Sequence, residues 1–205
     1  MVNKINTEGR ILDAAMEVFI AKGFDGARMQ EIADIAEINK ALLHYYFRSK
    51  DKLFEAVFQE TLLQIGPMVL SFVNEPIPLE VKIWKFVDEY IEIIKNNPRL
   101  PLFILNEIHV NPDRVLDFLN IGAFLDTDAM QEQLNKETEL NNLDQVDVKH
   151  FVVNILSMTI FPFIGKPIMQ KTLQIKEDDW EKFLDERKRI IPQTIMNWIK
   201  FNQKV

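Results

Sequence analysis

The 205-residue sequence predicts an all-α protein, in which an N-terminal head of three helices precedes a larger helical bundle. Three observations carry this prediction. Apolar residues recur every three or four positions in successive segments, which is the spacing of one helix face. Breaks such as Asn97-Pro98 and Asn111-Pro112 separate these segments. Runs of β-branched residues, which favour strands, are few.

The first helix of the head is expected over residues 7–22. Thr7 offers a side-chain oxygen that can cap the helix N-terminus. The apolar stripe of this helix consists of Ile11, Ala15, Val18 and Phe19. Gly23 follows, as expected where a helix ends in a left-handed residue, and Phe24 then packs into the core of the head.

Two short helices are expected next, over residues 29–36 and 40–47, joined by a turn at residues 37–39. Asn39 is a favourable N-cap for the second of them. Leu43 and Phe47 are four residues apart and face inward. The outer side carries Lys40, Ala41, His44 and Tyr45. This pattern is typical of a helix-turn-helix, whose second helix lies in the major groove of DNA.

The order of these segments resembles the N-terminal DNA-binding domain of the TetR/AcrR family of transcriptional regulators. The resemblance covers about residues 7–58, and its motifs are VFIAKGFDGARM and QEIADIAEINKALLHYYFRSKDKLF. Two positions depart from the family pattern. Glu37 stands where glycine is common, so the turn must accept a side chain even if φ there is positive. His44 stands where a tyrosine often contacts phosphate.

The resemblance implies that residues 1–50 bind double-stranded DNA and that residues 51–205 bind an effector and dimerise. It implies a regulator, more often a repressor in this family, that a small apolar ligand releases from a palindromic operator. The candidates for phosphate contact are Arg28, Asn39, Tyr45, Tyr46 and Lys50. The candidates at base edges are Gln30, Lys40, Ala41 and Leu42, and His44 completes the predicted DNA-binding set.

A long helix is expected from Asp51 to about Asn74, with Ser49 as its cap and a kink at Pro67. Helix N-termini attract phosphate, and Lys50 adds a point charge at this one. The resemblance implies that this lysine contacts the DNA backbone. Replacing it with alanine is then expected to lower the salt slope of DNA binding by about one.

Further helices are expected over residues 79–96 and 100–110, in two pieces within 113–140 with a break near Gly122, and over residues 146–163 and 177–201. A polar loop, NNLDQ, is expected at 141–145. Pro162 is expected to end or bend one helix, and Pro192 to bend another. The expected inward-facing residues are Val81, Trp84, Val87, Ile91, Ile94, Phe103, Ile104, Ile108, Trp180, Phe183, Leu184, Ile190, Ile191, Ile195, Trp198 and Ile199.

The segment 146–163 is apolar on almost every side, so most of its surface must be covered. The resemblance implies that this helix and the helix at 177–201 pair with their copies in a homodimer. A dimer would place two recognition helices ~34–36 Å apart, in successive major grooves. The alternative, in which 146–163 is the central core helix of one protomer, stays open.

The middle helices are expected to enclose an effector pocket that is mostly apolar with a few polar groups, as ligand sites commonly are. The candidate lining residues are Trp84, Phe103, Glu107, Met130, Phe151, Met158 and Phe161, and further polar candidates are Asn106 and His109. Core packing is the competing explanation for each aromatic residue.

The net charge of −7 is unusual for a DNA-binding protein, so its distribution matters. Residues 1–52 contain eight basic and eight acidic residues, which leaves the whole −7 in residues 53–205. Four basic residues lie within 40–52, against Asp51 alone. There is no cysteine, no secretory signal pattern and no apolar run near the ~18 to 20 residues that a membrane-spanning helix needs. These features favour a cytoplasmic protein without a membrane partner.

Two other classes of protein are alternatives. A helical-bundle enzyme with a di-iron site needs paired Glu-x-x-His motifs, and Asp147-x-x-His150 is the only similar spacing. No cysteine nucleophile, G-x-S-x-G motif or glycine-rich phosphate loop is present, so no catalytic residue, metal or cofactor is predicted. A helical adaptor that binds only protein is the third class, and it would not need basic residues gathered beside one helix.

Overall fold

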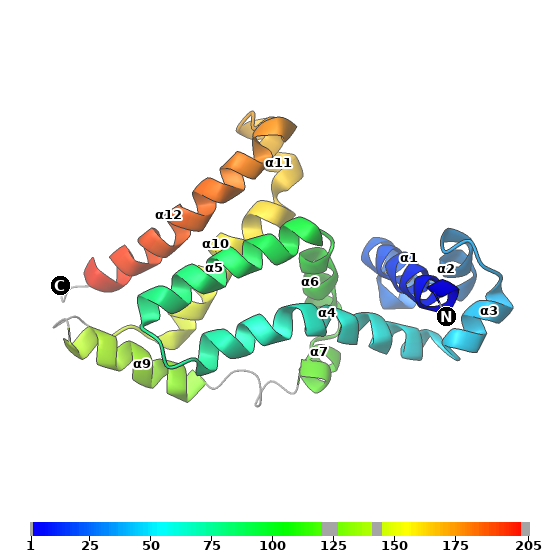
Figure 1. The fold of residues 1–205 in the computed structure, drawn as a ribbon, viewed down its shortest axis with the longest axis horizontal. Coiled ribbons are helices and arrows are strands. Elements are labelled where there is room, and N and C mark those ends of the chain that lie inside the picture. Colours follow the sequence, from blue (N-terminus) through cyan, green and yellow to red (C-terminus); the bar gives the residue numbers. More distant parts are fainter. Residues whose placement is uncertain (1, 120–126, 141–144, 202–205) are drawn as a thin grey trace. The chain divides into compact units, whose positions relative to one another are not determined.

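The computed structural model describes residues 2–119, 127–140 and 145–201. Within these ranges the chain forms helices and no strand, as predicted (Figure 1). The expected break near Gly122 and most of the expected loop at 141–145 lie outside the described residues.

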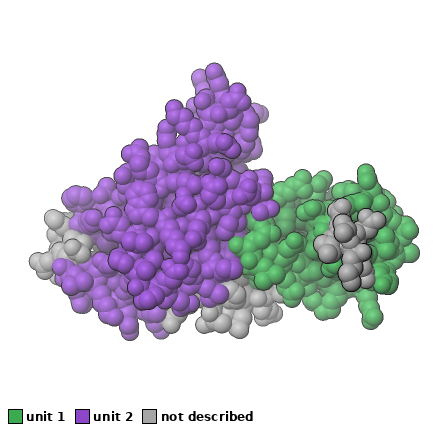
Figure 2. Space-filling view, in the orientation of Figure 1, with its two compact units in different colours: residues 1–64, 99–120 green, residues 65–98, 121–205 purple. Residues whose placement is uncertain are grey.

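Residue contacts divide the chain into two compact units, coloured separately in Figure 2. Unit 1 comprises residues 1–64 and 99–120, and unit 2 comprises residues 65–98 and 121–205. This division rests on packing, whereas the predicted boundary after residue 50 divides the chain by function and stays a prediction. One consequence is that the segment 99–120 packs with the N-terminal helices.

Unit 1 contains α1 (Val2–Gly26), α2 (Met29–Ile35), α3 (Lys40–Tyr46), the first part of α4 (Lys50–Asn74), α6 (Leu100–Val110) and α7 (Pro112–Leu119). The helix α1 begins at Val2 rather than at residue 7, so the predicted cap at Thr7 is wrong, because Thr7 lies inside the helix. Gly23 has a positive φ of 69°, as its place after the apolar stripe predicts. Helical structure resumes after it as far as Gly26, across a kink.

Aromatic rings form the centre of unit 1. The ring of Phe54 in α4 lies 5.1 Å from that of Phe19 and 5.2 Å from that of Phe24, both at steep edge-to-face angles. Phe103 of α6 continues the cluster, with its centroid 5.6 Å from that of Phe54. The two edge-to-face pairs have a preferred geometry and so help to fix α1 against α4, and the Phe54–Phe103 pair, tilted at 48°, joins α6 to them.

The helix α4 is continuous through Pro67. Its cap is Ser49, whose hydroxyl oxygen accepts a hydrogen bond from the Lys52 amide at 3.2 Å, as predicted. Its buried stripe includes Leu53, Val57 and Thr61, and the Thr61 hydroxyl donates to the Val57 carbonyl at 2.9 Å. The helix ends at Asn74, where the sequence predicts its end.

By length and composition alone, α4 could cross a membrane, with a mean hydropathy of 1.3 over 18 residues. The expectation that no segment approaches this length is therefore wrong for α4. The helices α10 (Val148–Ile164) and α11 (Lys166–Thr172) are long and apolar enough only if the bent pair is taken as one span. Core helices of soluble proteins can have the same length and composition, and 39% of the apolar 18-residue stretch of α4 is buried within the chain.

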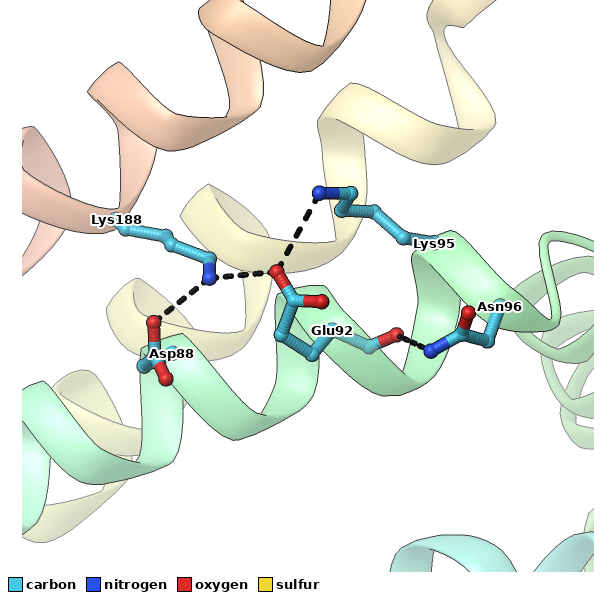
Figure 3. A network of polar contacts seen from close by, with 5 residues as sticks. All are labelled: Asp88, Glu92, Lys95, Asn96 and Lys188. Atoms are coloured by element: carbon cyan, nitrogen blue, oxygen red, sulfur yellow. Dashed lines mark hydrogen bonds and ion pairs between the residues drawn. The ribbon is translucent and has the colours of Figure 1, made fainter.

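Unit 2 contains the end of α4, α5 (Leu79–Asn96), α9 (Thr127–Leu140), α10 (Val148–Ile164), α11 (Lys166–Thr172), the 3-10 turn η1 (Glu177–Asp179) and α12 (Trp180–Phe201). The helices α5, α10 and α12 pack against one another (Figure 1). Between α5 and α12, the Lys188 ammonium lies 2.7 Å from Asp88 and 2.6 Å from Glu92 (Figure 3). This network links the two helices through charge as well as apolar packing.

Several expected details of unit 2 and α6 are wrong. Val81, Trp84, Ile108 and Ile190 are exposed rather than inward-facing. In α5 the buried face is instead formed by residues that include Lys82, Ile83 and Phe86. Pro162 does not end α10, which continues to Ile164 with Gly165 as its C-cap. The segment Gly165-Lys166-Pro167 ends α10, as the sequence indicates, and also starts α11 after a bend of 73°. Proline suits this position because the first turn of a helix needs no amide donor.

Candidate DNA-binding interface

The helices α2 and α3 lie within one residue of their predicted bounds, and the turn between them is tightly fixed. The Asn39 side chain accepts a hydrogen bond from the Leu42 amide at 2.7 Å, so Asn39 is the N-cap of α3. The Ile38 amide donates to the Ala33 carbonyl at 3.0 Å. Glu37 has a φ of 53°, the left-handed conformation anticipated from its place in the turn.

The exposed face of α3 is the predicted one. Leu43 is fully buried beneath the helix and Phe47 is nearly so. The outward side chains are Lys40, Ala41, His44 and Tyr45, and Leu42 is half-buried. Tyr45 is 70% exposed, so its ring and hydroxyl are available to a partner. A short helix with this face matches the geometry of a recognition helix.

Tyr45 and Tyr46 lie at the end of α3 with their rings perpendicular and 5.7 Å apart. Tyr46 is half-buried and packs against the core of unit 1. Its ring therefore limits the positions that the more exposed Tyr45 can take. The pair presents phenol groups beside the outward face, where hydroxyls can donate to phosphate oxygens.

Two further candidates lie on α2. Arg28 is its N-cap residue, and the side chain is exposed and makes no capping hydrogen bond. Gln30 is exposed, and its amide donates to the Asp34 carboxylate at 2.8 Å. Gln30 must exchange this contact before its amide can contact a base, whereas Arg28 is exposed at the helix start.

Lys50 occupies an unexpected place. Its ammonium donates to the backbone carbonyls of Asp25 at 3.2 Å and Ala27 at 3.3 Å. The same ammonium lies 4.5 Å from the centroid of the Phe24 ring. The side chain is half-buried and is directed at the corner between α1 and α2.

Sequence reasoning missed Arg10 as a residue that shapes this site. Its guanidinium, on α1, donates to the carbonyl of Ala36 at the end of α2 and lies 3.6 Å from the Glu37 carboxylate. The contact joins residues 26 positions apart. No local pattern marks such a residue, because an arginine on a polar helix face usually faces solvent.

The seven candidates for the effector pocket divide between the two units. Phe103 and Glu107 belong to unit 1, and the other five belong to unit 2. Met130 and Phe151 are buried, Met158 is half-buried, and Phe161 is exposed. Trp84 lines an open groove between α5 and α12, together with Lys85, Asp88, Asp185, Lys188 and Arg189. This groove is more charged than the apolar pocket that the sequence predicts.

The further polar candidates are also placed. His109 is exposed at the end of α6, and Asn106 is half-buried. Glu107 is 3% exposed, and burial is the main cause that raises the pKa of its carboxyl, partly offset by the Arg114 guanidinium at 3.4 Å. Asp147 caps α10 by accepting from the Lys149 amide at 2.8 Å, which gives it a structural use. Among the described residues, no group of three histidine, cysteine or acidic side chains could hold a metal ion.

Comparisons with known proteins agree with this geometry. Residues 11–57 match the family described as "Bacterial regulatory proteins, tetR family". The "Probable HTH-type transcriptional regulator YttP" of Bacillus subtilis is 20% identical over 176 residues, which cover 84% of each chain. The HTH-type transcriptional repressor NicS of Pseudomonas putida is 43% identical over 53 residues, 26% of this chain and 25% of NicS.

A solved structure extends the likeness across the whole fold. The TetR family transcriptional regulator PfmR from Thermus thermophilus has a TM-score of 0.64 and 16% sequence identity. The match covers 96% of each chain. At this identity the likeness concerns the fold, and the more specific similarity lies in the segment around α2 and α3.

Proposed function

Because this chain is a DNA-binding transcriptional regulator of the TetR family, we propose that it is a repressor that a small apolar ligand releases from a palindromic operator. The observation that carries this proposal is the exposed face of α3, with Lys40, His44 and Tyr45 outward above a buried Leu43. Lys40 can reach guanine acceptors, and Leu42 can contact a thymine methyl group. Repression is the activity named for NicS, one of the relatives.

The phosphate contacts come from residues around this face. Arg28 at the start of α2 and the hydroxyls of Tyr45 and Tyr46 are suited to hold the DNA backbone, which fixes the register of the protein on the duplex. Asn39, also a predicted contact, already uses its side-chain oxygen to cap α3. Its amide nitrogen is the group left to donate to DNA.

The chain acts as a homodimer through α10 and α12, near residues 146–163 and 177–201. Val153, Ser157 and Phe161 are exposed on α10 at four-residue spacing, so they lie on one face. Val153 is 62% exposed and Phe161 58%. Ile190 of α12 is also exposed. Apolar side chains gathered on one helix face support an interface that a second copy covers.

The effector binds in unit 2 and acts through α4. Pro67 lies inside α4 and has no amide to donate to the carbonyl of Leu63, which makes this turn the easiest place for the helix to bend. Bending there would change the spacing of the two heads, so that they no longer match successive grooves. The ligand must bind the released state more tightly than the DNA-bound state, or no shift occurs.

The protein has no enzymatic activity in this proposal and works in the cytoplasm, where the operator is. The relatives are named as transcriptional regulators, which supports this part of the proposal. A protein-only adaptor is less well supported, because it would not need the exposed cationic and phenolic face of α3.

The proposal is tested by selecting random DNA fragments with the purified protein and sequencing them, beside a mass measurement in solution. The expected result is an enriched palindrome with half-sites one turn apart, ~34–36 Å, bound by two chains. A pool without enrichment would reject the DNA-binding role. A mass of one chain at every concentration, also with DNA present, would reject the dimer.

A further inference from the structure

The corner between α1 and α2, residues 24–28, is held by two cations from elsewhere in unit 1. The Arg114 guanidinium of α7 lies 4.0 Å from the centroid of the Phe24 ring. The Lys50 ammonium of α4 lies 4.5 Å from the same centroid. Phe24 is 9% exposed, so both cations are attracted to a ring that water barely reaches.

Each cation has a second anchor. Lys50 directs two of its three donors to the carbonyls of Asp25 and Ala27, which follow Phe24 in the same corner. Arg114 is held by the carboxylate of Glu107 at 3.4 Å, and Glu107 is itself buried in α6. The corner is therefore connected to α4 by Lys50 and to α6 and α7 by Arg114.

The position of this corner matters for DNA binding because α2 starts immediately after it. Arg28 is both the last residue of the corner and the N-cap of α2. The Ile32 amide donates to the Arg28 carbonyl at 3.2 Å, so a shift of the corner moves the first turn of α2. Small displacements of a contact residue suffice to lose a directional contact with DNA.

We propose that Arg114 and Lys50 are positioning residues for DNA binding, which hold the α1–α2 corner through Phe24 and the carbonyls of Asp25 and Ala27. Lys50 keeps a third donor that can reach phosphate, as the sequence resemblance implies, so its role at the corner adds to that contact. Arg114 extends the set of residues that control the head to α7, more than fifty positions from α3 in sequence. This inference rests on the proposed DNA-binding function.

The salt dependence of binding separates a positioning role from a phosphate contact. A lost phosphate contact weakens binding and also reduces the slope of log affinity against log salt by about one. A lost positioning contact weakens binding and leaves this slope as it was. The variants are Lys50→Met and Arg114→Met, which keep much of the apolar stem, and Arg114→Lys, which keeps the charge.

We expect the dissociation constant for the selected operator to rise about fivefold to tenfold in both Met variants, with the wild-type salt slope in Arg114→Met and a slope lowered by about one in Lys50→Met. Arg114→Lys should recover part of the loss. In the double variant, operator affinity should fall by a factor smaller than the product of the two single-variant factors, because both cations contact one ring. The matched control is Arg99→Ala, which removes an exposed arginine of unit 1 that lies 3.2 Å from Glu17.

A second measurement does not depend on DNA. Hydrogen exchange of peptides that cover residues 24–30 should accelerate in Arg114→Met and Lys50→Met, while peptides from α12 keep their wild-type rates. This pattern distinguishes loosening of the corner from general loss of stability. If Arg114→Met does not fold, Arg114→Lys supplies both measurements.

Three results would overturn the inference: a salt slope lowered by about one in Arg114→Met, unchanged operator affinity in the Arg114 variants, or unchanged exchange at residues 24–30. Failure of the proposed function gives a different result. In that case the wild-type protein selects no DNA, although exchange at the corner still responds to the variants.

Discussion

The guanidinium of Arg10 in α1 donates a hydrogen bond to the backbone carbonyl of Ala36, the residue that ends α2. This carbonyl is one of those that a helix C-terminus leaves without an intrahelical donor. The contact fixes the entrance to the turn that carries α3. It therefore connects a residue with no place on the outward face to the orientation of that face.

Arg10→Ala should lower the free energy of unfolding by about 1 kcal/mol, the usual size for a hydrogen bond from a partly exposed charged group. Operator affinity should fall about fivefold, because the turn loses its support from α1. Urea unfolding and fluorescence anisotropy measure the two effects. Arg99→Ala removes an arginine that is also partly exposed, and it should change neither quantity appreciably. Equal effects in both variants would contradict a specific role for Arg10.

Glu37→Gly should stabilise the protein by about 0.5–1 kcal/mol, because a residue with a side chain is strained at a φ of 53°. The side chain is 86% exposed, and its distant ion pair with Arg10 contributes little. Thermal unfolding measures the gain. Gln174, which has a φ of 55°, offers a matched test in unit 2, where Gln174→Gly should act in the same direction. A lower melting temperature for Glu37→Gly would mean that the side chain makes a contact worth more than the strain.

Lys40→Ala should relax the preference for one base pair in each half-site, at a cost of about 1–3 kcal/mol for the preferred sequence. Binding to random DNA should weaken much less. Competition between the selected operator and single-position variants measures the change. Lys136→Ala removes a lysine from α9, outside the DNA-binding helices, and is the control. A uniform loss across all sequences would instead assign Lys40 to the DNA backbone.

Val153→Asp should convert the proposed dimer to single chains, because it places a charge on the apolar exposed face of α10. Operator affinity should fall with it, since one head cannot bind two half-sites. Analytical ultracentrifugation measures the mass. Leu140→Asp is a control on α9, where the leucine is 83% exposed. A dimer that survives Val153→Asp at micromolar concentration would exclude this face of α10 from the interface.

Lys188→Met should cost about 1 kcal/mol at neutral pH by removing the ion pairs that connect α12 to α5. Hydrogen bonding from Lys188 is the main cause that lowers the pKa of Glu92 below its ordinary 4.5. The folded state therefore holds its proton less tightly, and this stabilisation is present above pH 4.5 and is lost as the pH falls through the lowered pKa.

The difference between wild type and Lys188→Met should accordingly shrink in acid. Urea unfolding at a series of pH values measures this. Lys182→Met removes an exposed lysine from the same helix and should show no such trend. A difference that stays constant down to pH 3, about one and a half units below the ordinary carboxyl value, would show that Lys188 acts through packing alone.

The sequence predicted elements that depend on local chemistry. Asn39 and Ser49 cap the helices they were expected to cap, because a capping side chain acts on amides three residues away. The comparison of one turn position with a family pattern drew attention to Glu37, and its φ is positive. Local signals of this kind survive in the folded protein because the surrounding packing agrees with them.

The features that the sequence did not predict depend on residues distant along the chain. The buried face of α5 includes Lys82, whose ammonium donates to the Val73 carbonyl at 3.1 Å, and this turns Val81 and Trp84 outward. A stripe of apolar letters could not reveal that a lysine occupies the inner face. The sequence predicts Lys50 as a phosphate contact at a helix start and does not reveal that the carbonyls of Asp25 and Ala27 lie beside it. The contacts of Lys50 join segments more than twenty residues apart, which helical periodicity cannot relate.

The division of α4 between the two compact units imposes a constraint on length as well as on composition. Residues 50–64 of this helix belong to one unit and residues 65–74 to the other. Each residue of an α-helix advances the chain by ~100° about the axis. One residue inserted near the boundary, or one deleted, would put the buried stripes of the two halves out of phase, even if every side chain were kept. Natural variants of this protein should therefore tolerate substitutions in the middle of α4 far better than changes in its number of residues.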